Sequence, residues 1–170
     1  MKFIMLNGSS CAGKSTIVNR IMSEKERYYK LSYDAQKWLF SKYDRNIHFE
    51  DVRVVQRALA ETVCSLNYNI ICDSALYREN REKLLSIPKK YGYEIVEINL
   101  EADYEILAVR FDERVKDALA KNSKTISNTS KERFKELYNI YQSEKNNPAT
   151  VFRTDLLSEE EVVNSILQMN

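Results

Sequence analysis

A phosphate-binding motif lies close to the start of the chain. Gly8 and Gly13 frame the stretch Gly-Ser-Ser-Cys-Ala-Gly-Lys-Ser, which follows the P-loop pattern G-x-x-x-x-G-K-S. In such a loop the backbone N–H groups converge on one point, and the N-terminus of the following helix adds about half a positive charge there. Lys14 adds a full charge, and Ser15 offers a hydroxyl to Mg²⁺. The stretch therefore predicts a site for the phosphates of a nucleotide.

The sequence around the motif supports the same interpretation. Residues 3–6 form a short apolar run, and residues 15–22 contain no glycine or proline, so a strand and a helix are expected on the two sides of the loop. The chain has three glycines in 170 residues, which makes a chance match to the pattern rare. The loop residues expected to hold the nucleotide are Gly8, Ser9, Ser10, Cys11, Ala12, Gly13, Lys14, Ser15 and Thr16.

Asp73 is the candidate second ligand of the metal ion, beside Ser15. It ends the run Asn-Ile-Ile-Cys, and an acid after a short apolar strand matches the second nucleotide-binding element of P-loop proteins. There the carboxylate holds Mg²⁺ directly or through water. The alternative is that Asp73 caps a helix or starts a turn.

Asp34 is the candidate general base. It directly follows a strand-like segment, where a carboxylate would face the γ-phosphate and accept the proton of an attacking hydroxyl. The alternative role is an N-cap for the helix that carries Trp38, and the two roles are compatible.

Basic residues are candidates for contacts to the nucleotide phosphates and to the substrate. Arg110 and Arg114 lie one helical turn apart and could donate to the triphosphate, Arg110 as a nucleotide contact and Arg114 in catalysis. The alternative is a solvated helix face. The polar segment 122–129 suits a closing lid, so a lid is expected at about residues 110–130. A further cluster could contact an anionic substrate or be solvated surface: Lys37, Lys42, Arg45, Arg53 and Arg57.

The chain alternates strand-like and helical segments. Strands are expected at 2–6, 28–33, 69–72, 93–100 and 149–152, with helices at 13–24, from 34, at 50–66, 78–91, 103–121 and 130–141, and from 158. This alternation predicts an α/β fold in which a five-stranded parallel sheet carries helices on both faces, in one domain over residues 1–170. Catalytic residues should then lie at strand ends, in the loops at Gly8, Asp34, Asp73 and Asp155.

Composition narrows the class of protein. The formal net charge is +1, which favours a neutral or singly charged small molecule over nucleic acid as the acceptor, without excluding a local basic patch. No apolar run approaches a membrane span, and no signal-peptide pattern precedes the loop, so no membrane partner is expected. Three cysteines without ligand spacing indicate reduced thiols in the cytoplasm. His48 is the only histidine, which argues against a histidine-based metal site.

Several stretches resemble known small P-loop kinases. Residues 5–15 look like the opening of chloramphenicol phosphotransferase and its relatives. Residues 29–34 and 70–73, with the helix after them, resemble polynucleotide 5′-hydroxyl kinases, and residues 72–76 resemble a region of gluconate kinase. The resemblance implies a three-layer α/β fold, ATP with Mg²⁺, and transfer of the γ-phosphate to a hydroxyl. It also implies Asp34 as the base, Arg110 and Arg114 in the lid, and Lys37 on the substrate. Arg78 is the second residue expected on the substrate side.

Three functions remain open at this point. The chain could phosphorylate a hydroxyl of a small molecule, it could be a polynucleotide 5′-hydroxyl kinase, or it could be a nucleotide-binding regulator with little or no catalysis. A base such as Asp34 argues against the regulator, since a switch needs no group facing the acceptor. The absence of an Asn-Lys-x-Asp stretch argues against a GTPase, and the length argues against an AAA+ module with its additional helical domain.

Overall fold

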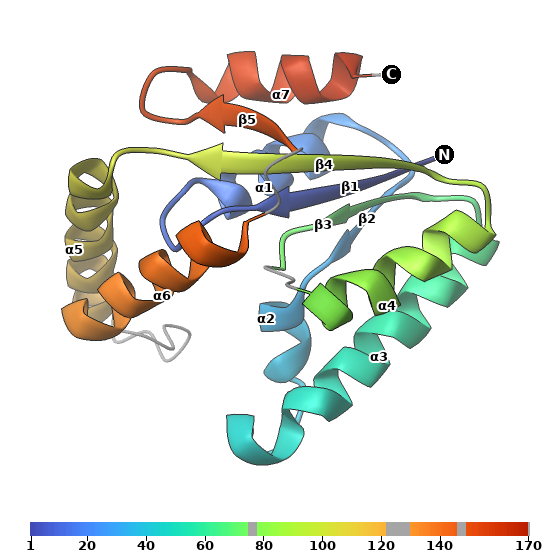
Figure 1. The fold of residues 1–170 in the computed structure, drawn as a ribbon, viewed down its shortest axis with the longest axis horizontal. Helices are drawn as coiled ribbons and strands as arrows, with labels where there is room; N and C mark the ends of the chain where they lie inside the picture. Colours follow the sequence, from blue (N-terminus) through green and yellow to red (C-terminus); the bar gives the residue numbers. More distant parts are fainter. Residues whose placement is uncertain (75–77, 122–129, 146–148, 170) are drawn as a thin grey trace.

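The computed structural model describes residues 1–74, 78–121, 130–145 and 149–169, and Figure 1 shows the fold. One five-stranded sheet has the order β2-β3-β1-β4-β5, and every neighbouring pair is parallel. The predicted parallel sheet is therefore confirmed. The chain order reverses at β1, which places the loop after β1 at the position where open α/β sheets bind ligands. The strands are β1 (Lys2–Asn7), β2 (Tyr28–Leu31), β3 (Asn69–Cys72), β4 (Glu94–Glu101) and β5 (Thr150–Arg153).

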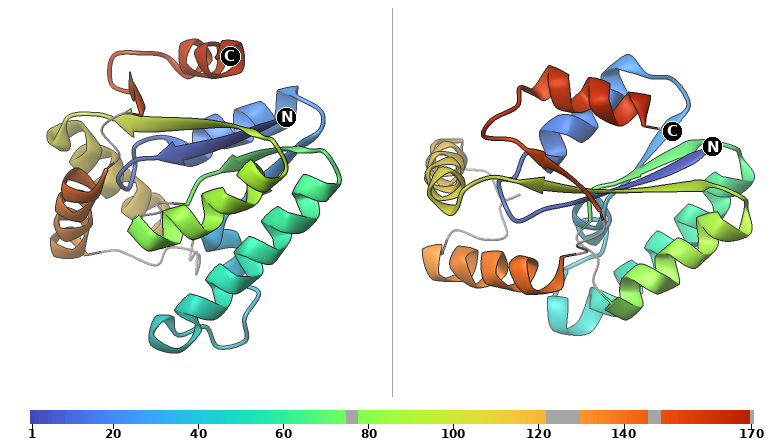
Figure 2. Two further views of the ribbon diagram at one scale, coloured as in Figure 1. Left: turned by 45° about the vertical axis from the view of Figure 1, so that its right-hand side comes forward. Right: turned by 45° about the horizontal axis from the view of Figure 1, so that its top comes forward.

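Helices cover both faces of the sheet. In Figures 1 and 2, α3 and α4 lie along one face, α1 and α7 lie on the other, and α5 and α6 stand beyond the carboxyl end of β4. Within the described ranges, no helix is both long and apolar enough to cross a membrane. The helices are α1 (Lys14–Glu24), α2 (Tyr33–Lys37), α3 (Arg45–Ser65), α4 (Arg78–Lys90), α5 (Tyr104–Ala120), α6 (Lys131–Glu144) and α7 (Glu159–Gln168).

The alternation of side chains along β1 explains the three layers. Phe3 and Met5 belong to one buried cluster, which includes residues of α3 and α4. Ile4 and Leu6 point to the opposite face and join a second cluster with residues of α1, α5, α6 and α7. Because successive side chains of a strand point to opposite faces, a fully apolar strand can hold two helical layers at once.

Capping residues place the starts of α2 and α3 differently from the sequence prediction. α3 begins at Arg45 and not at residue 50, because the Asp44 side chain accepts a hydrogen bond from the Asn46 N–H at 2.8 Å. β2 ends at Leu31, and Ser32 is the N-cap of α2. Ser158 and Glu161 form a capping box at the start of α7.

The segment predicted as a lid is only partly described. Residues 110–121 belong to α5 and its C-cap, and Phe111 and Ala118 are buried. Phe111 stacks on Phe134 of α6 with ring centroids 4.5 Å apart, so this part of the chain is anchored in the core. Residues 122–129 lie outside the described residues.

Candidate active site

The two glycines of the P-loop occupy positions that other residues fit poorly. A Cβ atom on Gly8 would lie 2.7 Å from the Leu100 carbonyl oxygen of the neighbouring strand. Gly13 has a φ of +88° and forms the N-cap of α1. Backbone of this shape is accessible to glycine at little cost. The loop therefore depends on both glycines to pass between β1 and α1.

The N-terminus of α1 is open to an anion. Gly13 makes no side-chain cap, and the first turn of the helix contains no acidic residue. The N–H groups of a first helical turn have no partner within the helix, and the helix dipole adds positive potential at the same place. These features together fit a bound phosphate group.

Lys14 folds back over the loop. Its Nζ donates hydrogen bonds to the carbonyl oxygens of Gly8 at 2.7 Å and Ser9 at 2.8 Å. Burial lowers the pKa of Lys14 to about 8, and the charges of Asp73 and Asp34 oppose that shift. Both carboxylates therefore act on the same amine, which places them around the phosphate loop.

Phosphate binding is expected to weaken as the pH rises above about 8. Above that pH the buried amine of Lys14 is largely neutral, and a bound phosphate, which favours the cation, must draw a proton from solvent. Below it the amine is already cationic, so binding takes up no proton there. Calorimetric titration with ADP, without divalent cations and in buffers of different ionisation enthalpy on either side of that pH, measures the uptake.

Lys14→Arg is the matched control, because a guanidinium keeps its charge throughout this range. Proton uptake should disappear in that variant. Equal uptake in the wild type and in Lys14→Arg would show that a different group titrates.

Cys11 lies in the loop with a φ of +65°, in the left-handed region. A side chain other than glycine is strained there, so Cys11→Gly is expected to stabilise the protein by roughly 1 kcal/mol, with the gain reduced by the greater freedom of glycine in the unfolded chain. Urea unfolding measures the difference. Cys11→Ala removes the thiol but keeps the strain, and a gain in that control as large as in Cys11→Gly would contradict the explanation.

One large cavity brings most of the predicted site residues together. Its volume is about 1380 Å³, more than the roughly 300–1000 Å³ of a pocket for one small ligand, so a nucleotide and an acceptor fit side by side. It contains all nine predicted loop residues and also Asp34, Lys37, Asp73, Arg110 and Arg114. Of the predicted site residues, Arg78 opens α4, and its side chain lies outside the described part of the structure.

Asp34 lies in the first turn of α2 and faces solvent in the cavity. Its side chain is 79% exposed, and it forms an ion pair with Lys37, whose side chain is 8% exposed. The Nζ of Lys37 also lies 4.9 Å from the centre of the Trp38 ring. The alternative role of Asp34 as an N-cap is wrong, because the Ser32 side chain accepts the hydrogen bond from the Ala35 N–H.

Asp73 follows β3 directly and lies beside the loop. Its side chain is 10% exposed, and one carboxylate oxygen lies 3.6 Å from the Nζ of Lys30. Within the described residues no group of three or more His, Cys, Asp or Glu side chains could form a metal cage. Mg²⁺ is usually held by one or two protein oxygens together with substrate phosphates and water. Ser15 and Asp73, which line one cavity beside the phosphate loop, fit that kind of site.

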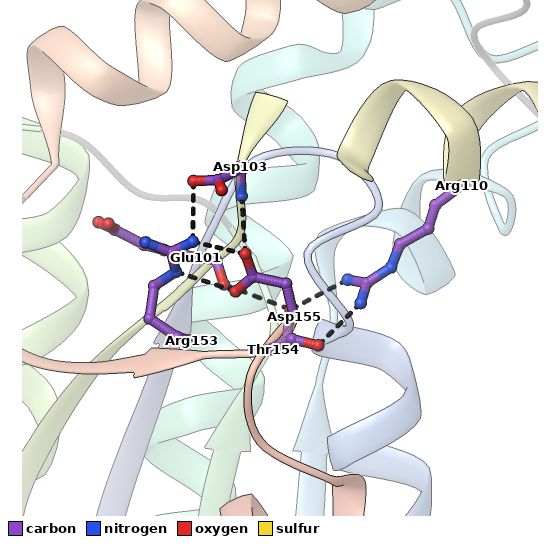
Figure 3. A network of polar contacts seen from close by, with 6 residues as sticks. All are labelled: Glu101, Asp103, Arg110, Arg153, Thr154 and Asp155. Carbon is purple, nitrogen blue, oxygen red and sulfur yellow. Dashed lines mark hydrogen bonds and ion pairs between the residues drawn. The ribbon is translucent and has the colours of Figure 1, made fainter. Parts of the chain in front are cut away.

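Arg110 contacts the loop after β5. Its guanidinium donates to the Thr154 hydroxyl oxygen at 3.0 Å and to the Thr154 carbonyl oxygen at 2.7 Å (Figure 3). The Thr154 N–H in turn donates to the Glu101 carbonyl oxygen at 2.8 Å. Arg110 therefore ties α5 to the ends of β4 and β5.

Asp155 has a structural role in the same loop. Arg153 donates to both of its carboxylate oxygens and also to Asp103, at 2.8 Å, as Figure 3 shows. The Arg153 hydrogen bonds hold the pKa of the Asp155 carboxyl well below its usual range. Asp155 does not line the large cavity. The loop at Asp155 thus supports the site through Thr154, and not through its carboxylate.

Comparison with known proteins assigns the chain to a family. Residues 3–141, which span β1 to most of α6, match the sequence model of the AAA_33 family, described as an AAA domain. The chain belongs to this AAA domain family. The described residues of the AAA domain form one sheet with its covering helices, so no separate helical domain of the kind found in AAA+ modules occurs among them. A search of curated proteins finds no match.

Solved structures share the whole fold of the AAA domain. A protein from Chloroflexus aurantiacus, provisionally described as a kinase, has a TM-score of 0.70 at 16% identity, covering 98% of this chain and 97% of its own. A sugar kinase from Janibacter has a TM-score of 0.62 at 18% identity, covering 98% and 92%. A tunicamycin resistance protein from Deinococcus radiodurans has a TM-score of 0.61 at 14% identity, covering 100% and 98%. The predicted likeness to small P-loop kinases is confirmed at the level of fold and family.

The AAA domain also contains site residues that sequence reasoning missed. Lys30, Ser74, Asn80 and Arg133 line the cavity, and none of them was predicted. Lys30 follows from the strand order, because β2 pairs with β3 and brings this residue next to Asp73. Arg133 comes from α6 and has no motif around it. Only its position in the first turn of a helix near the candidate lid could have indicated it.

Proposed function

We propose that this AAA domain is an ATP-dependent kinase that transfers the γ-phosphate to a hydroxyl group of a small molecule. The observation that carries the proposal is that Asp34 and Lys14 line one cavity large enough for two ligands. A phosphate-binding loop alone would serve a hydrolase or a switch equally well. A carboxylate in the same cavity, close enough to raise the pKa of Lys14, is suited to take the proton of a second molecule.

The chemistry divides between the two sides of the cavity. The loop N–H groups bind the phosphates, and Lys14 leaves the Gly8 and Ser9 carbonyl oxygens to contact the β- and γ-phosphates. The acceptor oxygen attacks the γ-phosphorus while its proton passes to Asp34, and the bond between the γ-phosphorus and the β–γ bridging oxygen breaks. ADP and a phosphate ester result. Lys37, paired with Asp34, keeps the carboxylate oriented towards the acceptor.

Arginines fit the developing charge on the transferred group. Arg114 and Arg133 line the cavity from α5 and α6, and Arg114 is close enough to Lys14 to lower its pKa. In our proposal both donate to phosphoryl oxygens. Ser15 and Asp73 would hold Mg²⁺, which when bound neutralises charge on the phosphate oxygens.

We assign part of the nucleoside of ATP to a second, smaller cavity of about 210 Å³. It adjoins the loop at Cys11 and Gly13, and its lining includes Ile17, Leu157 and Val162. Arg110 lines both cavities while it holds Thr154. We therefore assign Arg110 to positioning the nucleotide.

A polynucleotide 5′-hydroxyl kinase is the second candidate function, favoured by the number of basic side chains in the cavity. The overall net charge of +1 favours a small acceptor. The similarity to a sugar kinase is compatible with the small acceptor, although at that identity it establishes the fold alone. We also propose that the protein acts in the cytoplasm, where cysteines stay reduced.

The test of the proposal is ADP release from ATP and Mg²⁺ in the presence of single hydroxyl compounds. The panel contains sugars, sugar acids, nucleosides and a 5′-hydroxyl oligonucleotide, with water alone as the reference. Stimulation by a small compound, with the phosphate recovered on that compound, is expected. Stimulation by the oligonucleotide alone would favour the second candidate, and no stimulation by any acceptor would favour a regulator.

A further inference from the structure

The charge of the cavity differs from the charge of the chain. Its lining has eight basic side chains and two carboxylates, whereas the chain as a whole has a net charge of +1. Five of these cations come from α1, β2, α5 and α6: Lys14, Lys30, Arg110, Arg114 and Arg133. The other three come from α2 and α3, where the acceptor is proposed to bind: Lys37, Arg45 and Arg53. The proposed acceptor side of the cavity therefore carries three cations of its own.

Arg53 is a buried cation held in a fixed orientation. It is 7% exposed, and its guanidinium lies 4.4 Å from the centre of the Tyr33 ring and 5.3 Å from that of Phe49. One of its nitrogens donates to Gln56 Oε1 at 2.8 Å, and Gln56 donates to the Ser74 hydroxyl at 2.9 Å. Burial lowers the pKa of the Arg53 guanidinium, so its environment disfavours the charge. A bound anion would relieve that cost.

Arg45 is a second, solvent-exposed cation beside Phe49. Its guanidinium lies 5.3 Å from the centre of the Phe49 ring. Aromatic rings keep guanidinium planes in place and exclude water, which strengthens the attraction for an anion. Glu50 on α3, whose charge raises the pKa of Arg53, pairs with Arg57 at 2.7 Å and does not line the cavity. Of the five basic residues that the sequence groups together, Lys42 and Arg57 do not line the cavity and the other three do.

Resting on the kinase function proposed above, we infer that the acceptor is a hydroxyl compound that also carries a phosphate or carboxylate group, and that Arg45 and Arg53 bind this group. Planar arginine forks match both anions with paired hydrogen bonds. With its anionic group on α3, the acceptor would present its hydroxyl to Asp34 on α2. Arg45 and Arg53 are then specificity-determining residues.

Binding can be followed without turnover, because Trp38 is the only tryptophan of the chain and lines the cavity. The fluorescence of the ADP-loaded protein is titrated with matched pairs of an anionic and a neutral compound. Gluconate against sorbitol tests the carboxylate, and adenosine 3′-monophosphate against adenosine tests the phosphate. The anionic member of at least one pair should bind roughly 10- to 100-fold more tightly, and added salt should reduce the difference.

Arg45→Gln and Arg53→Gln should each remove most of that preference. Arg57→Gln, one turn further along α3, is the matched control and should keep it. Arg45 is exposed, so its variant tests the inference even if Arg53→Gln loses stability. Equal affinity for both members of every pair, no saturable binding of any anion, or equal effects of the Arg45 and Arg57 variants would overturn the inference.

Phosphate transfer measured in the same samples separates this inference from the proposed function. If neutral compounds were phosphorylated as fast as their anionic partners, the kinase function would be supported and the anion site would be contradicted. Arginine-dependent anion binding without any transfer would retain the anion site and remove the kinase.

Discussion

Lys14→Ala is expected to slow phosphoryl transfer by roughly 10²- to 10³-fold while the protein stays folded. The lost amine contributes charge where negative charge develops on the phosphates, an effect typically worth about 3–4 kcal/mol in the transition state. Stability should not suffer, because the Lys14 amine is bound only to two loop carbonyls and its burial disfavours the charge. Transfer rates and urea unfolding of the same preparation measure the two effects.

Lys25→Ala is the control at the other end of α1, where the side chain is exposed. It should match the wild type in both measurements. Unchanged transfer in Lys14→Ala would remove the P-loop from the mechanism.

Asp34→Asn is expected to lower kcat by roughly 10²- to 10⁴-fold with nucleotide affinity nearly unchanged. The amide keeps the shape of the side chain but cannot accept the proton of the acceptor. Because Ser32 caps α2, the substitution does not remove a helix cap. Single-turnover transfer with saturating ATP separates the chemical step from binding.

Asp51→Asn replaces an exposed carboxylate on neighbouring α3 and should leave kcat as in the wild type. If Asp34→Asn instead lost nucleotide binding and thermal stability together, the Asp34 carboxylate would be structural and the base would have to be sought elsewhere.

Local sequence patterns were sufficient to predict the phosphate loop and the sheet. Gly8 and Gly13 mark backbone that other residues fit poorly, and β1 and β3 are apolar because both of their faces are buried. The three-layer fold follows from these strands and the helices between them. The start of α3 was misplaced because the polar first turn after Asp44 shows no apolar periodicity, although Asp44 itself is a capping residue.

The acceptor side of the cavity could be predicted only in part. Asp34 and Lys37 follow one strand closely, so their position was apparent from the sequence. Arg53 was one of five basic residues with the same local appearance, and only the packing of α3 against α2 decides that it lines the cavity and Arg57 does not. Such a choice depends on which side of a helix faces a neighbouring element, and a mixed charged pattern does not specify it.

The most direct test of the proposed function is the fate of the γ-phosphate of ATP. Phosphorus-31 NMR spectra of a reaction with ATP, Mg²⁺ and the best acceptor of the panel distinguish a phosphate ester from free phosphate. A kinase with Asp34 as its base gives an ester resonance that grows together with ADP, and the resonance grows at least roughly 10²-fold more slowly with Lys14→Ala and with Asp34→Asn. Formation of free phosphate alone, at rates that no acceptor changes, would contradict the assignment of this protein as a kinase.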